Sequence, residues 1–374
     1  MTKHTEYDYV IVGSGLFGAV FAHQAGLANK KCMVVERRPH VGGNVYTENI
    51  SGINVHKYGA HIFHTGDREV WNYVNGLNDF IPYNHYVMAN YRGEVYNLPF
   101  NMNTFYRLWG TKTPDEAQKI LANQISEYAD TEPSNLEEQA LKLAGKDIYE
   151  KLIKGYTEKQ WGRKASELPT FIIKRLPLRY TFSNNYYNDR YTGIPSGGYT
   201  RMIEKMIARA DVVTDVNFNN NRKMYENIAK NIVYTGMIDE YFDYCYGALE
   251  YRSLRFETEL LDTDNFQGCA VMNYTDFETP YTRIIEHKHF ELGSVQPQTV
   301  ITREYPEKLD KSKEAYYPVN DERNNRLFER YRQKALSLKN VIFGGRLADY
   351  AYYDMDKVIR NALDISRTLI FDKL

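Results

Sequence analysis

The chain has 374 residues, 43% of them hydrophobic and 25% charged, which is typical of a globular protein large enough for two or more subdomains. Lys and Arg number 47 and Asp and Glu 48, so no general basic field exists to attract nucleic acid or an anionic membrane. A small anionic ligand stays compatible with this balance, because a few convergent arginines bind it locally.

The three cysteines, Cys32, Cys245 and Cys269, are odd in number and far apart. This spacing argues against a disulfide framework or a cysteine zinc site and favours a reducing compartment. The N-terminus lacks the apolar core of a signal peptide, and no run approaches the length of a membrane span. We therefore expect a cytoplasmic protein without a metal, a nucleic-acid partner or a membrane partner.

The first elements predicted along the chain form a strand–helix–strand unit. Tyr7–Val12 is an apolar run that indicates a buried parallel strand, Leu16–Ala28 a helix and Cys32–Glu36 a second strand. This order is typical of a βαβ unit that opens an α/β domain.

A dinucleotide fingerprint joins the first strand to the helix. GSGLFG sets Gly13, Gly15 and Gly18 in a G-x-G-x-x-G pattern, in which glycines permit a tight turn, close approach to a pyrophosphate and close helix–strand packing. The pattern follows a strand and opens a helix, and Glu36 ends the next strand, where it would bind a ribose hydroxyl. The sequence therefore predicts a pyrophosphate at the helix N-terminus.

The residues after Glu36 favour FAD over NAD. Arg37 and a Gly-Gly loop come directly after it, which resembles FAD-binding proteins of the glutathione-reductase type. Near the C-terminus, Arg346 lies between a strand and a helix that begins at Asp354–Asp356, whose positive end would face the flavin and favour its anionic reduced form. The predicted cofactor-binding residues are Gly13, Ser14, Gly15, Leu16, Phe17, Gly18, Glu36, Arg37, Gly43, Asn44, His61, Ile62, Arg346, Tyr353, Asp354, Met355 and Asp356.

Capping signals predict a helical insertion in the middle of the chain. Thr113–Glu116 and Ser134–Glu137 are each read as a capping box, with Thr113 and Ser134 as N-caps. The second helix is expected to stop at Gly145 and another to run over residues 146–154, with its apolar side chains on one face. Residues 101–178 are thus interpreted as a helical domain.

Short β-branched and aromatic segments between residues 265 and 317 predict antiparallel strands. Val341–Gly345 then predicts a strand and Asp354–Leu369 a helix. The fold expected is α/β, with a discontinuous Rossmann-like FAD-binding domain, a helical insertion and an antiparallel β-sheet substrate domain. We assign residues 1–78, 200–244 and 334–374 to the first domain, 101–178 to the second, and 79–100, 179–199 and 245–333 to the third.

Five motifs together resemble one family. KYGAHIFHT, NLPFNMNTF, GYTEKQWG, RLPLRYTFSNNYYNDRYTGIPSGGYT and GGRLADYAYYDMD are similar, in order and almost end to end, to UDP-galactopyranose mutases of the bacterial type. The resemblance implies a flavoenzyme that interconverts UDP-galactopyranose and UDP-galactofuranose without net redox. It also implies that N5 of reduced FAD attacks the anomeric carbon while UDP leaves. An external electron donor and a homodimer are expected on the same ground.

The resemblance also assigns site residues. Arg175 and Arg283 would bind the diphosphate, with Arg175 on a mobile loop over about residues 166–178. His61 and His64 would lie beside the flavin; they count among the catalytic candidates with the two arginines, although neither receives an acid or base role. The predicted substrate-binding residues are Asn84, Leu152, Tyr156, Thr157, Trp161, Arg175, Tyr186, Asn273, Arg283, Tyr317 and Tyr352, and Leu152 stands where the family often has an aromatic residue.

The motif from Arg179 to Thr200 is rich in tyrosine, arginine and asparagine and poor in aliphatic residues, which is typical of a pocket wall. Within it, Tyr186 is the residue expected to touch substrate. Two alternatives to a mutase stay open: an FAD-dependent oxidase or desaturase of the same fold, and a non-catalytic flavin or nucleotide-sugar sensor.

Overall fold

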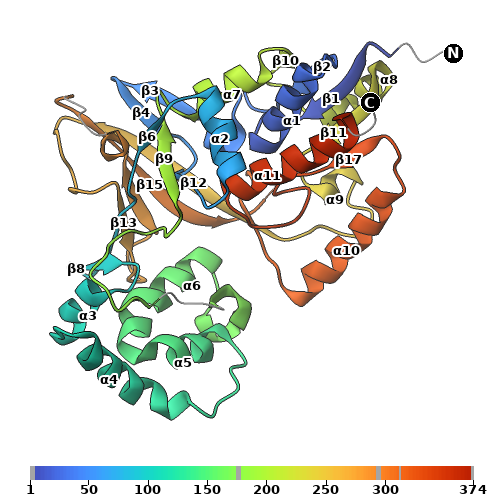
Figure 1. Ribbon diagram of the computed structural model, residues 1–374. Helices are drawn as coiled ribbons and strands as arrows, with labels where there is room; N and C mark the ends of the chain where they lie inside the picture. Colours follow the sequence, from blue (N-terminus) through green and yellow to red (C-terminus); the bar gives the residue numbers. More distant parts are fainter. Residues whose placement is uncertain (1–4, 174–177, 292–295, 311–312, 372–374) are drawn as a thin grey trace.

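The computed structural model describes residues 5–173, 178–291, 296–310 and 313–371 of the chain (Figure 1). It contains two main sheets, with helices packed on one of them and a separate group of helices beyond the edge of the other. The predicted α/β class, with a Rossmann-like part and a second sheet, is confirmed. Within the described residues, no helix is both long and apolar enough to cross a membrane.

The first sheet has five parallel strands in the order β10-β2-β1-β11-β17. Its central strand β1 is almost completely apolar, as expected for a strand covered on both faces. The sheet draws strands from the two ends and the middle of the chain. These are β1 (Tyr7–Val12), β2 (Cys32–Val35), β10 (Asp211–Val213), β11 (Ala229–Tyr234) and β17 (Val341–Phe343).

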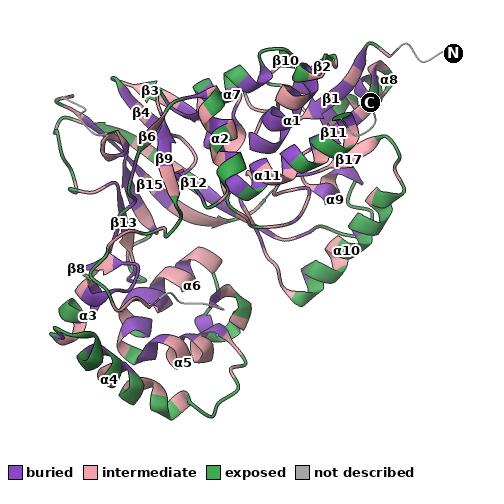
Figure 2. Cartoon of the chain, in the orientation of Figure 1, coloured by how far each residue is buried: buried purple, intermediate pink, exposed green. Residues whose placement is uncertain are grey.

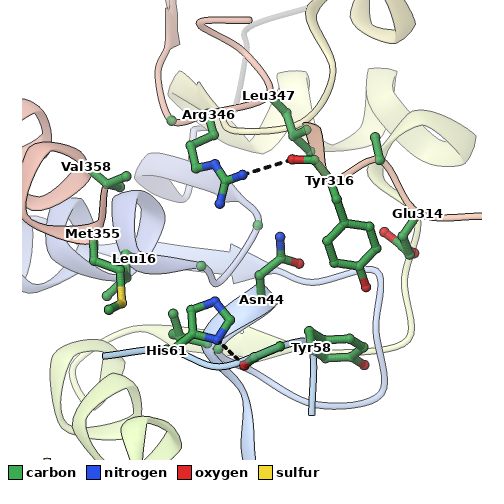
Figure 3. Close-up of a pocket in the computed structure, with 18 of the residues that line it drawn as sticks. Leu16, Asn44, Tyr58, His61, Glu314, Tyr316, Arg346, Leu347, Met355 and Val358 are labelled. Carbon is green, nitrogen blue, oxygen red and sulfur yellow. Dashed lines mark hydrogen bonds between the residues drawn. The ribbon is translucent and has the colours of Figure 1, made fainter. Parts of the chain in front are cut away.

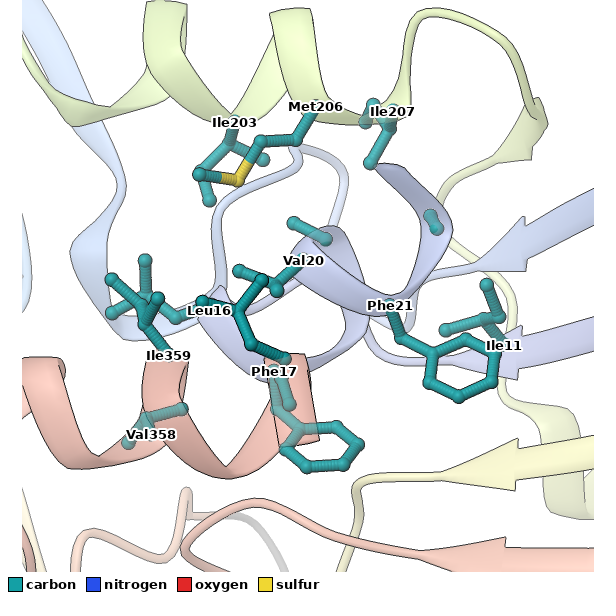
Figure 4. Close-up of a cluster of buried hydrophobic side chains, with 14 of the residues drawn as sticks. Ile11, Leu16, Phe17, Val20, Phe21, Ile203, Met206, Ile207, Val358 and Ile359 are labelled. Atoms are coloured by element: carbon teal, nitrogen blue, oxygen red, sulfur yellow. The ribbon is translucent and has the colours of Figure 1, made fainter. Parts of the chain in front are cut away.

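Three helices build the core on one face of this sheet: α1 (Leu16–Leu27), α7 (Tyr199–Ile207) and α11 (Met355–Ser366). Helix α1 lies between the other two, so it is apolar all round rather than on one stripe. Figure 4 shows its Leu16 and Val20 between Ile203 of α7 and Ile359 of α11. This packing fixes the N-termini of α1 and α11 close to each other.

The second sheet has seven strands in the order β16-β12-β15-β14-β13-β7-β8. It is antiparallel, as predicted, except for one pair, β13 with β7, which is parallel. The pairing joins segments that are almost two hundred residues apart. The strands are β7 (Val87–Tyr91), β8 (Glu94–Leu98), β12 (Tyr251–Leu261), β13 (Val271–Tyr274), β14 (Arg283–Glu286), β15 (Thr299–Lys308) and β16 (Tyr317–Pro318).

A separate group of helices lies near β8 in Figure 1. The capping box predicted at Thr113–Glu116 is confirmed. The next helix begins one residue later than predicted, because Asn135 and not Ser134 is its N-cap residue, and the Glu138 side chain accepts a hydrogen bond from the Ser134 N–H. This helix is broken at Gly145, as predicted, because a φ of 73° and a ψ of 174° are not helical, and a second helical stretch follows directly after it. The helices are α3 (Met102–Trp109), α4 (Pro114–Ile125), α5 (Leu136–Ile148) and α6 (Gly155–Trp161), with a π-helical segment, Tyr149–Lys154, before α6.

The remaining elements connect or cover these units. Helix α10 carries mostly exposed side chains on the outer surface (Figure 2). The sequence did not predict the β3–β4 hairpin or the three-stranded sheet in the order β5-β9-β6, because their strands are only three to five residues long. These elements are β3 (Thr47–Ile50), β4 (Ile53–His56), β5 (Phe63–Thr65), β6 (Phe80–Pro82), β9 (Tyr191–Pro195), α2 (Arg68–Leu77), α8 (Arg222–Ile228), α9 (Ile238–Tyr241) and α10 (Glu322–Leu336).

Candidate active site

A cavity of about 590 Å³ extends between the two main sheets. One end is formed by the β1–α1 turn, the segment after β2 and the start of α11. The other end is formed by residues of α6, β13, β14 and β15, together with Tyr317 of β16 and Tyr352, which precedes α11. Its size suits a cofactor or a small ligand.

The β1–α1 turn requires its glycines for different reasons. Gly13 has a φ of 96°, and a Cβ on it would lie 2.2 Å from Thr235 Oγ1. A Cβ on Gly18 would lie 2.1 Å from the carbonyl oxygen of Gly13. A Cβ on Gly15 would meet no protein atom within 4 Å, so the space beside it is open. The turn is therefore tight on its protein side and open on the cavity side, where a pyrophosphate would approach.

Two helix N-termini face this cavity without a side-chain cap. Helix α1 begins after Gly15 and helix α11 after Asp354, and neither N-cap residue accepts a hydrogen bond from its own helix through a side chain. Both N-cap residues line the cavity. The free N–H groups and the positive ends of the helix dipoles favour negative charge there. These observations fit a dinucleotide such as FAD.

Glu36 is buried where the fingerprint predicts it, but its oxygens already have protein partners. Its Oε2 accepts from the N–H of Ser14 at 2.8 Å and from the Ser14 hydroxyl at 2.6 Å, and its Oε1 accepts from the Arg38 N–H. Arg38, which was not among the predicted residues, stacks on Tyr58, with its guanidinium carbon 4.1 Å from the ring centre. Its Nη1 is buried and has no hydrogen-bond partner within the described residues. Arg37 lies further out and pairs with Glu314 at 2.6 Å.

Arg346 reaches into the middle of the cavity, close to Asn44, Tyr316 and His61 (Figure 3). Its Nη2 donates to the Tyr316 carbonyl at 2.9 Å, and its buried Nε has no partner in the described part of the chain. The guanidinium lies 4.9 Å from the ring centre of Tyr352. Because the Arg346 side chain lines the cavity, its positive charge favours an anionic group on a bound ligand.

The opposite end of the cavity centres on Arg283, the first residue of β14. Its Nη2 donates to the Tyr156 hydroxyl, and its Nε lies 3.5 Å from Glu304 Oε1. Burial opposes the charge of Arg283, but Glu304, Tyr156 and Tyr317 raise its pKa well above the usual range. A permanently charged guanidinium with a poorly satisfied buried Nε is suited to bind an anion.

Tyrosines surround this arginine. Tyr317 and Tyr352 pack with ring centres 5.4 Å apart, and Tyr156, Tyr186 and Tyr317 line the same part of the cavity. Burial is the first cause that raises the pKa values of Tyr156 and Tyr317. Their hydroxyls stay protonated at neutral pH and can donate to an anion without adding charge.

Most of the predicted site residues line this cavity. Those that do not are Ser14, Asn84, Leu152, Thr157, Trp161 and Asp356, while Arg175 lies outside the described residues. Asn84 is exposed, whereas Leu152 is buried in the apolar core beside Tyr149 and Ile153. Trp161 lines a second cavity, and the role predicted for Leu152 at the substrate finds no support in its position.

Several cavity residues were missed by the sequence analysis, among them Arg38, His85 and Glu304. Arg38 had a signal, since it follows Arg37 in the same basic pair. Glu304 and His85 had none, because an isolated charged or polar residue within a strand or a loop is usually solvated.

Comparison with known proteins gives two matching family profiles. Residues 151–352 match the family described as UDP-galactopyranose mutase, and residues 11–77 match an NAD(P)-binding Rossmann-like domain. The first match covers α6, β14 and the tyrosines around Arg283, and the second covers the glycine turn.

Individual relatives match over nearly the whole chain. A probable UDP-galactopyranose mutase of Klebsiella pneumoniae is 41% identical over 95% of this chain and 93% of its own length. A dTDP-fucopyranose mutase of Escherichia coli is 38% identical over 96% of this chain and 98% of its own.

Solved structures show how widely the fold is shared. A reduced UDP-galactopyranose mutase superimposes with a TM-score of 0.75 at 13% identity, over 97% of this chain and 94% of its own. A putrescine oxidase variant superimposes with a TM-score of 0.57 at 12% identity, over 98% of this chain and 99% of its own. At such identities these two structures support the fold and nothing more.

Proposed function

The chain is an enzyme of the UDP-galactopyranose mutase family of flavoenzymes, and on that premise we propose that it interconverts UDP-galactopyranose and UDP-galactofuranose without net oxidation. The proposal takes reduced FAD as the active cofactor. The observation that carries it is Arg283, a charged anion-binding group in the same cavity as the glycine turn and the α11 N-terminus. An anionic leaving group can therefore be held within reach of the cofactor.

Residues at the glycine end would hold the cofactor. Gly13, Gly15 and the first turn of α1 would receive the pyrophosphate, and Arg346 and the α11 N-terminus would face the flavin end. The α11 dipole would favour an anionic reduced flavin. When reduced, the cofactor supplies the nucleophile, its N5 atom, for the anomeric carbon of the sugar.

Residues at the arginine end would hold the substrate. Arg283 would bind the diphosphate and stabilise the charge that develops as it leaves, with the Tyr317 and Tyr352 hydroxyls as further donors. Tyr156, which already hydrogen-bonds Arg283, would stack on uracil, and Arg175 would close over the diphosphate from its loop.

A second candidate is the corresponding reaction of a dTDP-linked 6-deoxy sugar. The 38% identity with a dTDP-fucopyranose mutase over 96% of this chain favours it. Both reactions exchange a pyranose for a furanose ring, and they differ in the base, the ribose 2′-hydroxyl and the sugar C6 hydroxyl.

One experiment tests both candidates. The purified flavoprotein is reduced with dithionite and incubated separately with UDP-galactofuranose and dTDP-fucofuranose, and the pyranose products are separated by chromatography. The proposal expects efficient conversion of the UDP sugar by the reduced enzyme and little conversion by the oxidised one. Preferred conversion of the dTDP sugar would transfer the assignment to the second candidate. Conversion of neither would contradict the mutase function.

The proposal includes an external electron donor, because the isomerisation itself supplies no electrons to the flavin. It also includes a homodimer, which light scattering coupled to size-exclusion chromatography checks, and a cytoplasmic location.

A further inference from the structure

We propose that His64 and Asp189 act as a pair that carries a proton to and from the sugar, with Asp189 as the positioning residue and His64 as the group that meets the substrate. This inference rests on the proposed function, and it gives one of the cavity histidines a defined role. It also assigns a purpose to the middle of the tyrosine-rich motif, which binding alone does not explain.

The two side chains come from different parts of the chain and meet at the edge of the cavity. His64 is the middle residue of β5, and Asp189 lies just before β9, the strand paired with β5. His64 Nδ1 and Asp189 Oδ2 are 2.7 Å apart. His64 Nε2 has no hydrogen-bond partner within the described residues, and the side chain lines the cavity. A carboxylate on Nδ1 holds the proton there and leaves Nε2 for the ligand.

The ring of His64 is also fixed from its face. It stacks on Tyr187 with ring centres 3.7 Å apart and an angle of 14° between the planes. Tyr187 in turn stacks on His85 and packs edge-on against Tyr186. The imidazole is therefore held by a carboxylate at one nitrogen and by a ring across its face, which leaves it little freedom to rotate.

Comparison of the cavity histidines singles out His64. In the described part of the cavity, the others are His61 and His85. Burial lowers the pKa of His61 to about 4 and that of His85 to about 3, so both are neutral near pH 7. His61 Nδ1 bonds the Gly59 carbonyl at 2.7 Å, and neither ring pairs with a carboxylate in the described residues. Of the three rings in this described cavity wall, His64 alone has a partner that can stabilise an imidazolium.

The position of the pair matches the place where the sugar would react. The next residue, Thr65, donates to Asp356 in the first turn of α11 at 2.9 Å. On the other side, Tyr186 and Tyr187 share the cavity with Arg283 and Tyr352. His64 thus lies between the end of the cavity assigned to the flavin and the group assigned to the diphosphate.

Ring exchange requires one proton to move between two sugar oxygens. When the C1–O5 bond breaks, the bonding pair stays on O5, which takes a proton from the His64 imidazolium. When O4 forms its bond to C1, the C4 hydroxyl returns its proton to the neutral His64 Nε2. C1 stays bonded to the nucleophile in between, and the protein gains and loses no proton over the cycle. The reverse reaction uses the same two transfers.

The test compares Asp189→Asn with Asp115→Asn, in which a surface carboxylate paired with Lys119 on α4 is lost instead. We expect Asp189→Asn to lower kcat about 10²-fold while KM for the UDP sugar and Kd for UDP change less than about two-fold. Asp189→Glu should recover much of the rate, and Asp115→Asn should match the wild type. The double variant His64→Asn with Asp189→Asn should be no slower than His64→Asn alone.

A measurement independent of activity follows the ring itself. Nitrogen-15 NMR of histidine-labelled protein, with His64→Asn to assign the signal, should show Nδ1 protonated in the wild type. In Asp189→Asn the amide N–H can donate to Nδ1, so the proton should shift to Nε2, while the His61 signals stay unchanged. Unchanged His64 signals, or a kcat within two-fold of the wild type, would overturn the inference. If the wild-type enzyme converts neither sugar, the proposed function is wrong. The NMR measurement does not depend on turnover, so it still shows whether Asp189 determines which nitrogen of His64 is protonated.

Discussion

The two ends of the cavity are built in different ways. At the glycine end, the shape is set by backbone: a Cβ at Gly13 or Gly18 would overlap protein atoms, and two helix N-termini present free N–H groups. At the arginine end, the chemistry is set by side chains from α6, β14, β15 and β16 that meet only in the folded chain. A backbone site is encoded locally, whereas a side-chain site depends on the packing of the whole molecule.

This difference implies different responses to substitution. At the arginine end, removal of one side chain should abolish function and leave fold and cofactor intact. At the glycine end, addition of one methyl group should disturb cofactor or fold. The strongest response is expected at Arg283 and the weakest at buried carboxylates remote from both ends.

Replacement of Arg283 by Ala should lower kcat/KM by about 10³-fold, because the leaving diphosphate loses a buried charge-assisted partner. Flavin content should stay at the wild-type value, as measured by absorbance at constant protein. Arg303→Ala is the matched control, since Arg303 lies on the adjacent strand and pairs with Glu259 on the surface. If the two variants were equally active, side chains at this end would not carry the reaction.

Gly15→Ala and Gly18→Ala should separate cofactor binding from folding. The new Cβ of Gly15→Ala meets no protein atom, so the Tm of the apoprotein should be unchanged while FAD binds at least about ten-fold more weakly. In Gly18→Ala the Cβ overlaps the Gly13 carbonyl, so the apoprotein Tm should fall as well. Flavin fluorescence titration and thermal unfolding check both. Equal FAD affinity of Gly15→Ala and wild type would contradict a pyrophosphate at this turn.

Glu286, buried in the second sheet, should stabilise the protein above acidic pH. Burial alone would raise its pKa, but the nearby His289 ring, with Nε2 3.2 Å from Oε2, and hydrogen bonds from the N–H groups of Phe266 and Gln267 and from the Thr299 hydroxyl lower it to about 2. Its contribution is therefore fully present above pH 4.5 and is lost as pH falls toward 2. Glu286→Gln should lose about 2 kcal/mol at pH 7 and less at pH 3, as measured by urea unfolding. If the unfolding free energies of Glu286→Gln and wild type differed by the same amount at pH 3 and pH 7, the charge of Glu286 would be excluded as the cause.

Asp239, buried near the first sheet, should behave in the opposite way. Burial raises its pKa to about 6, although the Leu249 N–H donates to one carboxylate oxygen and opposes this shift. The other carboxylate oxygen has no hydrogen-bond partner in the described residues. The folded state then binds a proton more tightly than the unfolded state, so stability falls as pH rises from about 4 to 6. Asp239→Asn should raise the unfolding free energy by about 1 kcal/mol at pH 8, and the gain should shrink at pH 5. If the unfolding free energy of Asp239→Asn rose equally at all pH values, the cause would be a change in packing and not the removal of the buried charge.

The fold could be predicted where the signal was local. The glycine fingerprint, the first strand and helix, and the Thr113 capping box are complete within a few residues. The parallel pairing of β13 with β7 could not be predicted, because it joins distant segments with no pattern of their own. At Ser134 and Asn135 two adjacent residues can each cap a helix, and the sequence pattern selected the wrong one.

For the site, local chemistry again decided what could be found. The fingerprint alone locates the cofactor end, but Tyr156 and Arg283 were selected only through a family resemblance, since no spacing in the sequence joins them. Leu152, selected in the same way, is buried in the core. His85 and Glu304 became visible only when strands and loops from distant segments met around one cavity.

The most direct test of the account is the number of turnovers that each reduced flavin supports. Enzyme reduced once under anaerobic conditions and freed of excess dithionite is mixed with a large excess of UDP-galactofuranose, while product and flavin absorbance are followed together. Isomerisation without net redox should give hundreds of UDP-galactopyranose molecules per flavin, with the flavin still reduced at the end. Product limited to one molecule per flavin, with reoxidation of the flavin, would contradict isomerisation without net redox and indicate an oxidoreductase instead.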